Sequence, residues 1–404
     1  MIYQNGRNAD NEIVGSRELL RVYCGNRIIW QRSDPDPVDQ TRITIIMLDS
    51  TTLLPTGQVY YVDTIAEIVP YKDYGLHKVV IGSQAGITRI ENSALASEYG
   101  LVEIVIPSSV LSIGTMAFQY CNELRTVTIA QGITAIADRT FEQCTNLSTV
   151  TIPQGVTSIG IRAFYNCQWL KTAEMPESVA AIGQYAFYNC RGLENIHFTS
   201  RITRIEDYAF SNCVLALWNN GTEIILPDTV TYVGRYAFSS MWKITRMHFP
   251  DTITSLLGTF DDCHNLIEAN IPTYLSAWGS LQNCYKLTSL VFPSYVENFS
   301  CSFTFCNDLA TLQLPSSIGS ASSKSAFING VSVSELRIPQ GVKYATIGYD
   351  YNLTTVYFPS SITEIDFSTI GNIPRLRTIY IDKPENSISG APWGARNATV
   401  IWTG

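Results

Sequence analysis

Five cysteines recur at intervals of 23 residues along the middle of the chain. They are Cys121, Cys144, Cys167, Cys190 and Cys213, and a phenylalanine precedes each of them by three residues. A fixed period of this length is typical of solenoids, in which each repeat forms one coil that packs against its neighbours. The spacing therefore predicts a repeat solenoid and argues against a globular enzyme core.

The repeat that follows Cys144 shows what each coil should contain. Residues 147–152 alternate apolar and polar side chains, which predicts a short strand with its apolar side chains inward. Pro153 ends this strand because proline lacks an N–H group for the ladder. Residues 159–160 are expected to turn the chain, and residues 163–167 to form a short helical turn on the opposite face. Stacked coils predict mostly β structure, with one long parallel β-sheet plus short helical turns.

Eight of the ten cysteines fall at one position of successive repeats. This structural cysteine column comprises Cys121, Cys144, Cys167, Cys190, Cys213, Cys263, Cys284 and Cys306. Small apolar groups at a repeated position are expected to face inward as free, buried thiols. Disulfides are the less favoured alternative, because the chain begins without a secretory leader. Cys24 and Cys301 lie outside the column.

The complete repeat reads Ile-Pro-x-x-Val-x-x-Ile-Gly-x-x-Ala-Phe-x-x-Cys-x-x-Leu, most regularly between Pro107 and Cys213. This pattern resembles the BspA-like leucine-rich repeats, and the resemblance extends over residues 76–381. It implies a leucine-rich-repeat, right-handed curved array that serves for binding, commonly at bacterial surfaces.

The two ends of the chain depart from the repeat. Two apolar runs flank Gly25 and Asn26, which predicts a small β-hairpin as an N-terminal module. Its expected anchoring residues are Tyr23, Ile28 and Trp30. The predicted division is a hairpin anchoring module at 1–32, a Pro/Asp linker at 33–40, an N-terminal cap at 41–75, repeats at 76–381 and a C-terminal cap at 382–404.

Both ends also resemble, over few residues, bacteriophage virion structural proteins. The N-terminal likeness lies in the hairpin followed by a stiff, acidic linker, and the C-terminal likeness in residues 392–402. This second resemblance implies attachment to a particle through the N-terminal module.

Charge excludes two classes of partner. The chain has 27 Lys and Arg against 35 Asp and Glu, a net charge of −8, and no basic run. Nucleic-acid phosphates and anionic lipids both require clustered Lys and Arg, so neither is an expected partner. The start lacks the apolar core of a signal peptide, and no apolar run approaches the roughly 20 residues that span a bilayer. We therefore expect no signal peptide and no membrane insertion.

Residues that support catalysis or bind metal do not gather in the sequence. The four histidines are spread over the whole array, and residues 261–264 are the one stretch that resembles a metal site. Cys263 belongs to the cysteine column, however, and its neighbours belong to a turn. Phosphate loops, nucleophile elbows and zinc-protease motifs do not occur. The prediction is a protein that is not an enzyme and carries no cofactor or metal.

The exposed side of the predicted sheet offers the candidate binding surface. Polar residues that alternate with the buried ones point to its concave face, where the first half is rich in Thr and Ser. Threonine is also a common solvent-facing strand residue, so a simple solvated face is the alternative. The best candidates combine ring area or charge with a polar tip. They are His197, His248, Tyr357, Tyr380, Arg246 and Arg337.

Four functions are compatible with these features. The first is a bacteriophage virion protein, associated with a tail or fibre, that binds other virion proteins through its N-terminal module. Its solenoid would then bind a glycan or protein of the host cell surface. The second is a bacterial cell-surface adhesin of the same repeat family. An intracellular binding scaffold and an enzyme follow, the enzyme last because no catalytic group can be assembled. A homo-oligomer is compatible with each of them.

Overall fold

The computed structural model divides into two compact units, Met1–Ser178 and Val179–Gly404. Backbone alone is described for the strands between residues 2 and 30, for residues 217–218 and 325–331, and for a few single strand residues. The structure otherwise describes residues 40–53, 55–65, 75–215, 221–279, 281–299, 302–316, 325–347, 352–366, 373–395 and 397–404.

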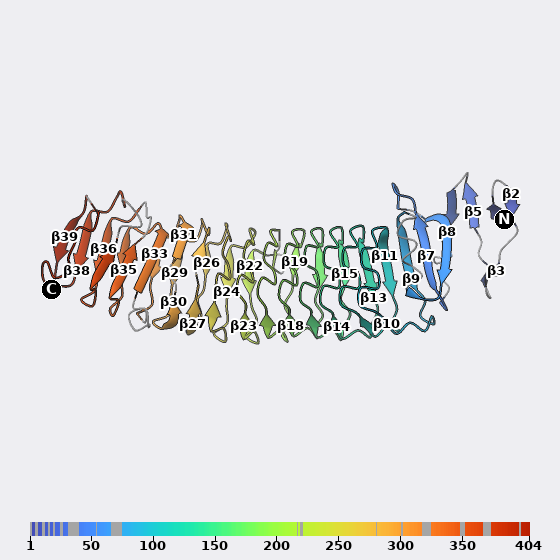
Figure 1. Ribbon diagram of the computed structural model, residues 1–404, viewed down its shortest axis with the longest axis horizontal. Coiled ribbons are helices and arrows are strands. Elements are labelled where there is room, and N and C mark those ends of the chain that lie inside the picture. Colours follow the sequence, from blue (N-terminus) through green and yellow to red (C-terminus); the bar gives the residue numbers. More distant parts are fainter. Residues whose placement is uncertain are drawn as a thin grey trace. The chain divides into compact units, whose positions relative to one another are not determined.

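Parallel strands, one from each coil, build the main sheet of the first unit (Figure 1). Val127, Val150 and Ala173 lie in register on neighbouring strands and are buried, while threonines on either side of them face outward. The predicted strand pattern is therefore confirmed. The strands are β9 (His77–Ile81), β11 (Leu101–Ile106), β13 (Thr126–Ile129), β15 (Thr149–Thr151) and β17 (Thr172–Glu174).

Antiparallel strands precede this sheet. β7 (Ile43–Leu48) pairs with β9 on one side and with β8 (Pro55–Val62) on the other, and its isoleucines are buried. An antiparallel hairpin at this position covers the edge of the first parallel strand. The predicted hairpin near the N-terminus is confirmed as β5 (Arg21–Cys24) and β6 (Arg27–Trp30).

Two further hairpins in the same segment were not predicted. They are β1 (Ile2–Gln4) with β2 (Arg7–Ala9), and β3 (Ile13–Val14) with β4 (Arg17–Glu18). Each strand is only two or three residues long, too short to show a period of two in the sequence.

A second row of short parallel strands shows that the prediction of one long sheet was wrong (Figure 1). The Ile-Gly pair that was expected only to turn the chain hydrogen-bonds to the previous coil, as Gly160 N–H does to Ile136 O at 2.8 Å. Glycine permits this approach, because a Cβ on Gly160 would lie 2.6 Å from Asp138 Oδ1. In the first unit these strands are β10 (Arg89–Ile90), β12 (Ser112–Ile113), β14 (Ala135–Ile136) and β16 (Ser158–Ile159).

The second unit repeats the arrangement with more interruptions. Its main-row strands are β19 (Asn195–Ile196), β21 (Leu217–Trp218), β22 (Glu223–Ile225), β24 (Arg246–His248), β26 (Glu268–Ala269), β29 (Ser289–Val291), β32 (Thr311–Gln313), β34 (Glu335–Arg337), β36 (Thr355–Phe358), β38 (Thr378–Ile381) and β39 (Thr399–Trp402). Its second-row strands are β18 (Ala181–Ile182), β20 (Arg204–Ile205), β23 (Tyr232–Val233), β25 (Ser255–Leu256), β27 (Leu275–Trp278) and β30 (Val296–Phe299). A further parallel row contains β28 (Leu281–Gln282), β31 (Ser302–Cys306), β33 (Ser325–Val331), β35 (Tyr344–Ile347) and β37 (Glu364–Asp366).

The segment between the Ile-Gly pair and the cysteine is a chain of turns, so the predicted helical turn was wrong. Met116 and Tyr120 have φ of 59° and 64°, in the left-handed region, which breaks any right-handed helix. Their N–H groups instead donate to the next coil, Met116 to Asp138 O at 3.0 Å and Tyr120 to Glu142 O at 2.9 Å. The turns thus join neighbouring coils as a strand ladder would. No helix among the described residues is long and apolar enough to cross a membrane.

The phenylalanines and cysteines of the repeat form the core. Phe118 and Phe141 are fully buried and stack with ring centroids 5.3 Å apart and an interplanar angle of 7°. Cys144 donates its S–H to Phe118 O at 3.0 Å, and Cys167 donates to Phe141 O at 3.1 Å. All eight column cysteines are free and buried, so this prediction is confirmed. Burial raises the pKa of the Cys144 thiol well above its usual value.

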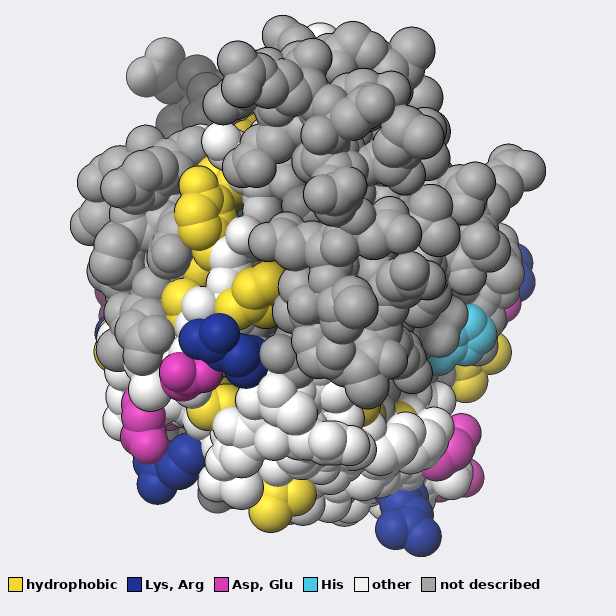
Figure 2. Space-filling view, turned by 90° about the vertical axis from the view of Figure 1, so that its right-hand side faces the viewer, with side chains coloured by type: hydrophobic (Ala, Val, Ile, Leu, Met, Phe, Trp, Pro, Cys, Tyr) yellow, Lys and Arg dark blue, Asp and Glu magenta, His cyan; other side chains and the backbone are white. Residues whose placement is uncertain are grey.

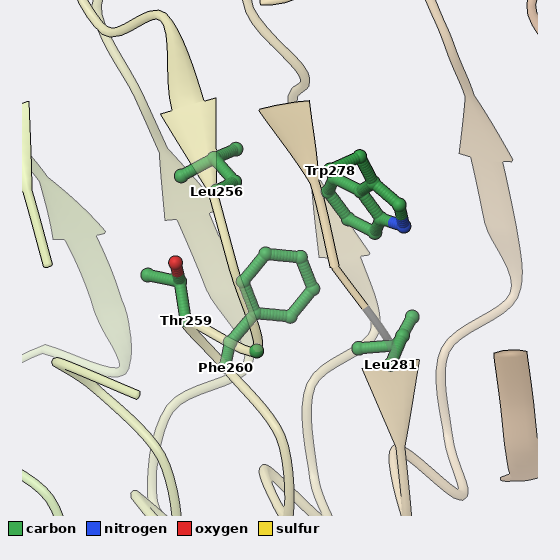
Figure 3. Close-up of a pocket in the computed structure, with 6 residues that line it drawn as sticks. Leu256, Thr259, Phe260, Trp278 and Leu281 are labelled. Carbon is green, nitrogen blue, oxygen red and sulfur yellow. The ribbon is translucent and has the colours of Figure 1, made fainter. Parts of the chain in front are cut away.

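Trp278 departs from this regular packing in the second unit. Its ring meets Phe260 edge-on at 5.7 Å, beside Leu256 and Leu281 (Figure 3). The gap that these side chains line leaves no space for a water molecule. Thr259 Oγ1 and Trp278 Nε1 are buried here and have no hydrogen-bond partner among the described residues. The gap is a packing irregularity of the core and offers no room for a ligand.

Candidate binding surfaces on the exposed sheet faces

In β13, β15, β36 and β38 the first and third residues point away from the core, because alternate side chains lie on the same side of a strand. In the first unit the first positions of β13, β15 and β17 are Thr126, Thr149 and Thr172, in register across three coils. Thr128 and Thr151 form the next row and are exposed. The predicted hydroxyl-rich surface therefore exists, and nothing in its geometry distinguishes it from a solvated face.

The C-terminal sheet carries a different surface, here named the aromatic ladder. It consists of Arg337, Tyr357, Tyr380 and Ile401, which lie in register on β34, β36, β38 and β39. The Arg337 guanidinium carbon lies 3.7 Å from the centroid of the Tyr357 ring. Tyr357 and Tyr380 stack with centroids 4.7 Å apart and an interplanar angle of 5°. Three of the six predicted contact residues are thus neighbours on one surface.

Polar groups accompany the aromatic ladder on the same face. Glu335 lies 2.5 Å from Arg337 and partly neutralises it. The row that begins with Glu335 continues in register through Thr355, Thr378 and Thr399. The face therefore combines stacked rings with hydroxyl groups, an arrangement that suits amphipathic contact with a macromolecule.

Arg246 and His248, two more of the predicted contacts, lie together on β24. His248 Nε2 is 2.6 Å from Glu223 Oε1, and Arg246 Nε is 3.5 Å from Glu268 Oε2. Both side chains therefore already contact acidic residues of the adjacent strands. About half of each side chain in the Arg246–Glu268 pair is exposed, so this ion pair contributes little free energy of folding.

His197 is exposed and directly follows β19, a different strand from β24 and from the strands of the aromatic ladder. The structure therefore separates the six candidates into a C-terminal group, a pair on β24 and a single histidine. The side chains of the proposed anchors Tyr23, Ile28 and Trp30 lie outside the described part of the chain.

Positively and negatively charged side chains lie side by side on the face that Figure 2 shows. Hydrophobic side chains lie between them. Within the described residues, no three His, Cys, Asp or Glu side chains form a group able to hold a metal ion. In the stretch 261–264, which resembles a metal site in the sequence, Cys263 is buried and donates its S–H to Phe238 O at 3.3 Å.

The sequence interpretation missed an aromatic row at the turn that leads into the strands of the second unit. Trp242, His264 and Tyr285 each directly follow a member of the cysteine column or Met241, which replaces one. The Trp242 and His264 rings stack with centroids 5.2 Å apart, and the His264 and Tyr285 rings lie 4.9 Å apart at an interplanar angle of 41°. Comparing the residue after the cysteine in successive repeats would have found this row.

The fold and these surfaces define a class of protein: a leucine-rich-repeat solenoid with exposed sheet faces and no assembled catalytic group among its described residues. The chain belongs to the BspA type leucine-rich repeat family, whose model matches residues 88–216, 217–300 and 279–391 in six copies. The family predicted from the repeat is therefore confirmed.

Leucine-rich repeat proteins of known structure are similar to this chain, and the first of them shares its fold. A leucine-rich repeat protein from Bacteroides ovatus is 20% identical and superimposes with a TM-score of 0.60, covering 82% of this chain and 96% of that chain. A leucine-rich repeat protein from Eubacterium ventriosum is 22% identical, with a TM-score of 0.43 and coverage of 82% and 90%. A leucine rich cell surface protein from Faecalibacterium prausnitzii is 20% identical, with a TM-score of 0.39 and coverage of 78% and 92%. A comparison with curated protein sequences found no significant match.

Proposed function

We propose that this protein is a non-enzymatic adhesin of a bacterial cell surface and that the aromatic ladder contacts its partner. The observation that carries the proposal is the continuous stack of Arg337, Tyr357 and Tyr380 on an exposed sheet face. Tyrosine and arginine are the side chains most often found at the energetic centre of protein interfaces.

The stack is ordered before any partner arrives. Tyr357 is held between the Arg337 guanidinium and the Tyr380 ring, so binding would immobilise few additional rotamers. Ordering flexible side chains at an interface costs roughly 0.5–1.5 kcal/mol each, and a preformed stack avoids most of that cost. The ladder is therefore suited to bind without rearrangement.

The shape of the face favours a macromolecule, and specifically a protein. The ladder and the adjoining threonine row form a broad sheet surface. Small ligands are usually enclosed in concave sites, whereas flat surfaces rich in tyrosine and hydroxyl groups are typical of protein recognition. A glycan partner remains the alternative outcome of the test.

Membership of the BspA type family supports a place at a bacterial surface, since the repeat pattern is commonly found there. The bacteriophage virion hypothesis has no comparable support, because neither the matched family nor the three structures described above point to a phage particle. Its N-terminal anchor and its virion partners stay predictions.

The test is adhesion of beads coated with the purified chain to immobilised mucin and a panel of extracellular-matrix proteins. We expect binding to at least one of these proteins, and a loss of roughly tenfold or more when Tyr357 and Tyr380 are both replaced by alanine. Tyr274→Ala with Tyr295→Ala is the matched control. Those rings also stack, 6.2 Å apart, and are 47% and 48% exposed, but they lie outside the ladder.

Equal losses in both double variants would refute the assignment of the ladder, because a non-specific effect of exposed tyrosines would then explain the binding. Binding of the wild type to the glycans released from mucin, but to no protein, would replace the protein partner by a glycan.

A further inference from the structure

We infer that the Trp242–His264–Tyr285 row is a second binding site, and that it takes an anionic polysaccharide. The three rings lie next to one another along three successive coils, and Trp242 and Tyr285 are 45% and 38% exposed. This site is independent of the aromatic ladder, because it lies at the turns that enter the strands and uses none of the ladder residues.

Two cations accompany the rings. Lys243 directly follows Trp242, and Lys286 directly follows Tyr285; both are exposed, and neither forms an ion pair with any described residue. The coil between them supplies Asn265, which donates its Nδ2 hydrogen to Trp242 O at 2.7 Å. Arg246 on the neighbouring sheet face differs, since it is paired with Glu268 at 3.5 Å.

The spacing of the lysines defines the geometry of the ligand. Neighbouring strands lie about 4.8 Å apart, so two coils separate Lys243 and Lys286 by about 10 Å. A ligand that satisfies both must carry negative charges at intervals of that order, with an apolar surface between them to cover His264. A chain of acidic sugars has both properties, since each ring offers C–H groups for aromatic contact and its carboxylate or sulfate offers charge. Asp308, exposed on the coil after Lys286, limits the site at that end.

An acidic peptide fits the same charges less well. Peptides usually bind by adding a strand to a free sheet edge or by filling side-chain pockets. Here β24 is paired with β22 and β26, and β26 is paired with β24 and β29, so neither strand has a free edge. The interior gap near Trp278 does not hold even a water molecule. A polysaccharide needs neither feature, because it can lie along exposed rings.

The test measures the affinity of the full chain for polygalacturonate and for dextran sulfate at low ionic strength. We expect binding to at least one of them, and the comparison tells whether a carboxylate or a sulfate is the preferred anion. Lys243→Glu with Lys286→Glu should weaken it about a hundredfold, since a hydrogen bond to a charged group is worth roughly a factor of ten. Trp242→Ala with Tyr285→Ala should weaken it about tenfold.

Matched controls separate the site from general effects. Lys171→Glu makes the same charge change at an exposed position of another coil, and Trp169→Ala removes another exposed tryptophan, 62% accessible, from a turn. Both should bind as the wild type does, and thermal melting checks that every variant is folded. Equal binding of uncharged dextran, equal binding of poly-glutamate, or unchanged binding by the double lysine variant would each overturn the inference.

Discussion

Replacing Gly258 with alanine tests how closely the half-buried tyrosine stack of the second unit is fitted to its neighbours. Tyr185, Tyr208 and Tyr236 occupy one position of three successive coils, and their rings stack 4.8 and 5.1 Å apart. The next coil has Gly258 at this position. A Cβ on Gly258 would lie 2.4 Å from Tyr236 Cε1 and 2.8 Å from its Cδ1, so the ring covers the glycine.

The magnitude follows from two separate costs. Gly258 has φ of +63°, and a left-handed conformation costs an L-residue about 1–2 kcal/mol. Forcing the Tyr236 ring aside adds about 1–3 kcal/mol, the usual cost of overpacking. Gly258→Ala should therefore lower the local free energy of unfolding by about 2–5 kcal/mol. When Tyr236→Ala is also present the overpacking disappears, and the same substitution should cost only about 1–2 kcal/mol.

Native-state hydrogen exchange of the amides around residues 258–263 is the appropriate measurement, because a repeat array need not unfold in one step. Gly86→Ala provides the matched control, since Gly86 has φ of +72° but nothing within 4 Å of its Cβ position. It should show the backbone cost alone. If Gly258→Ala costs the same with and without Tyr236, the ring does not cover the glycine and the reasoning fails.

Two further predictions concern pH. Burial raises the pKa of Cys263 and Cys306 to about 12, so the folded state favours the protonated thiols. The free energy of unfolding should therefore be undiminished below pH 9 and should fall as the pH rises from 9 towards 12. Urea titrations across that range should show this loss, less steeply in Cys263→Ala, and rapid modification of the native thiols at pH 8 would contradict it. Burial lowers the pKa of His77 below its ordinary value of 6.5, although its Nδ1–H also donates to Gly75 O at 3.1 Å. The folded state therefore favours neutral His77, and the stabilisation that this provides is complete above pH 6.5 and should be lost as the pH falls. His77→Phe should flatten the acid side of a plot of urea midpoint against pH. An unchanged plot would disprove this role of His77.

The columns of the core could be predicted from the sequence because every coil places the same residue type at the same depth. Phe141 is fully buried between Phe118 and Phe164, at centroid distances of 5.3 and 5.4 Å, and its spacing of 23 residues from each already implied this. Such a column needs no knowledge of long-range contacts, since the contact is always with the preceding or the following repeat.

The turns were mispredicted because an i, i+3 apolar pair is compatible with more than one backbone path. Phe164 and Cys167 have the spacing of a helical turn, but Asn166 between them has φ of 62°. Asparagine is among the few residues that adopt this conformation readily, and it recurs here as Asn189 and Asn212. The repeated asparagine was therefore the signal for a left-handed residue. The second row of strands was missed because its members in the regular repeats, such as β14 and β16, are only two residues long.

The register between neighbouring strands explains which part of the binding surface could be predicted from the sequence. Tyr357 and Tyr380 lie 23 residues apart, so their neighbouring positions follow directly from the repeat length. The row of Trp242, His264 and Tyr285 uses three residue types and intervals of 22 and 21, which hide it from a search for identical residues. A surface row is formed by position in the coil, and its chemistry can change from coil to coil while its geometry stays fixed.

Stacked rings on a solenoid surface consequently fall into two kinds, which burial separates. The row that ends at Tyr236 is half-buried and covers the backbone of Gly258, so its rings fill space that the glycine leaves and stabilise the turns. Trp242 and Tyr285 leave 45% and 38% of their surface exposed and are followed by exposed lysines that pair with no described acidic residue. Exposed apolar area has no stabilising role in the isolated chain, because the hydrophobic effect rewards only area removed from water. The second kind of row is therefore where a ligand can contribute the missing burial.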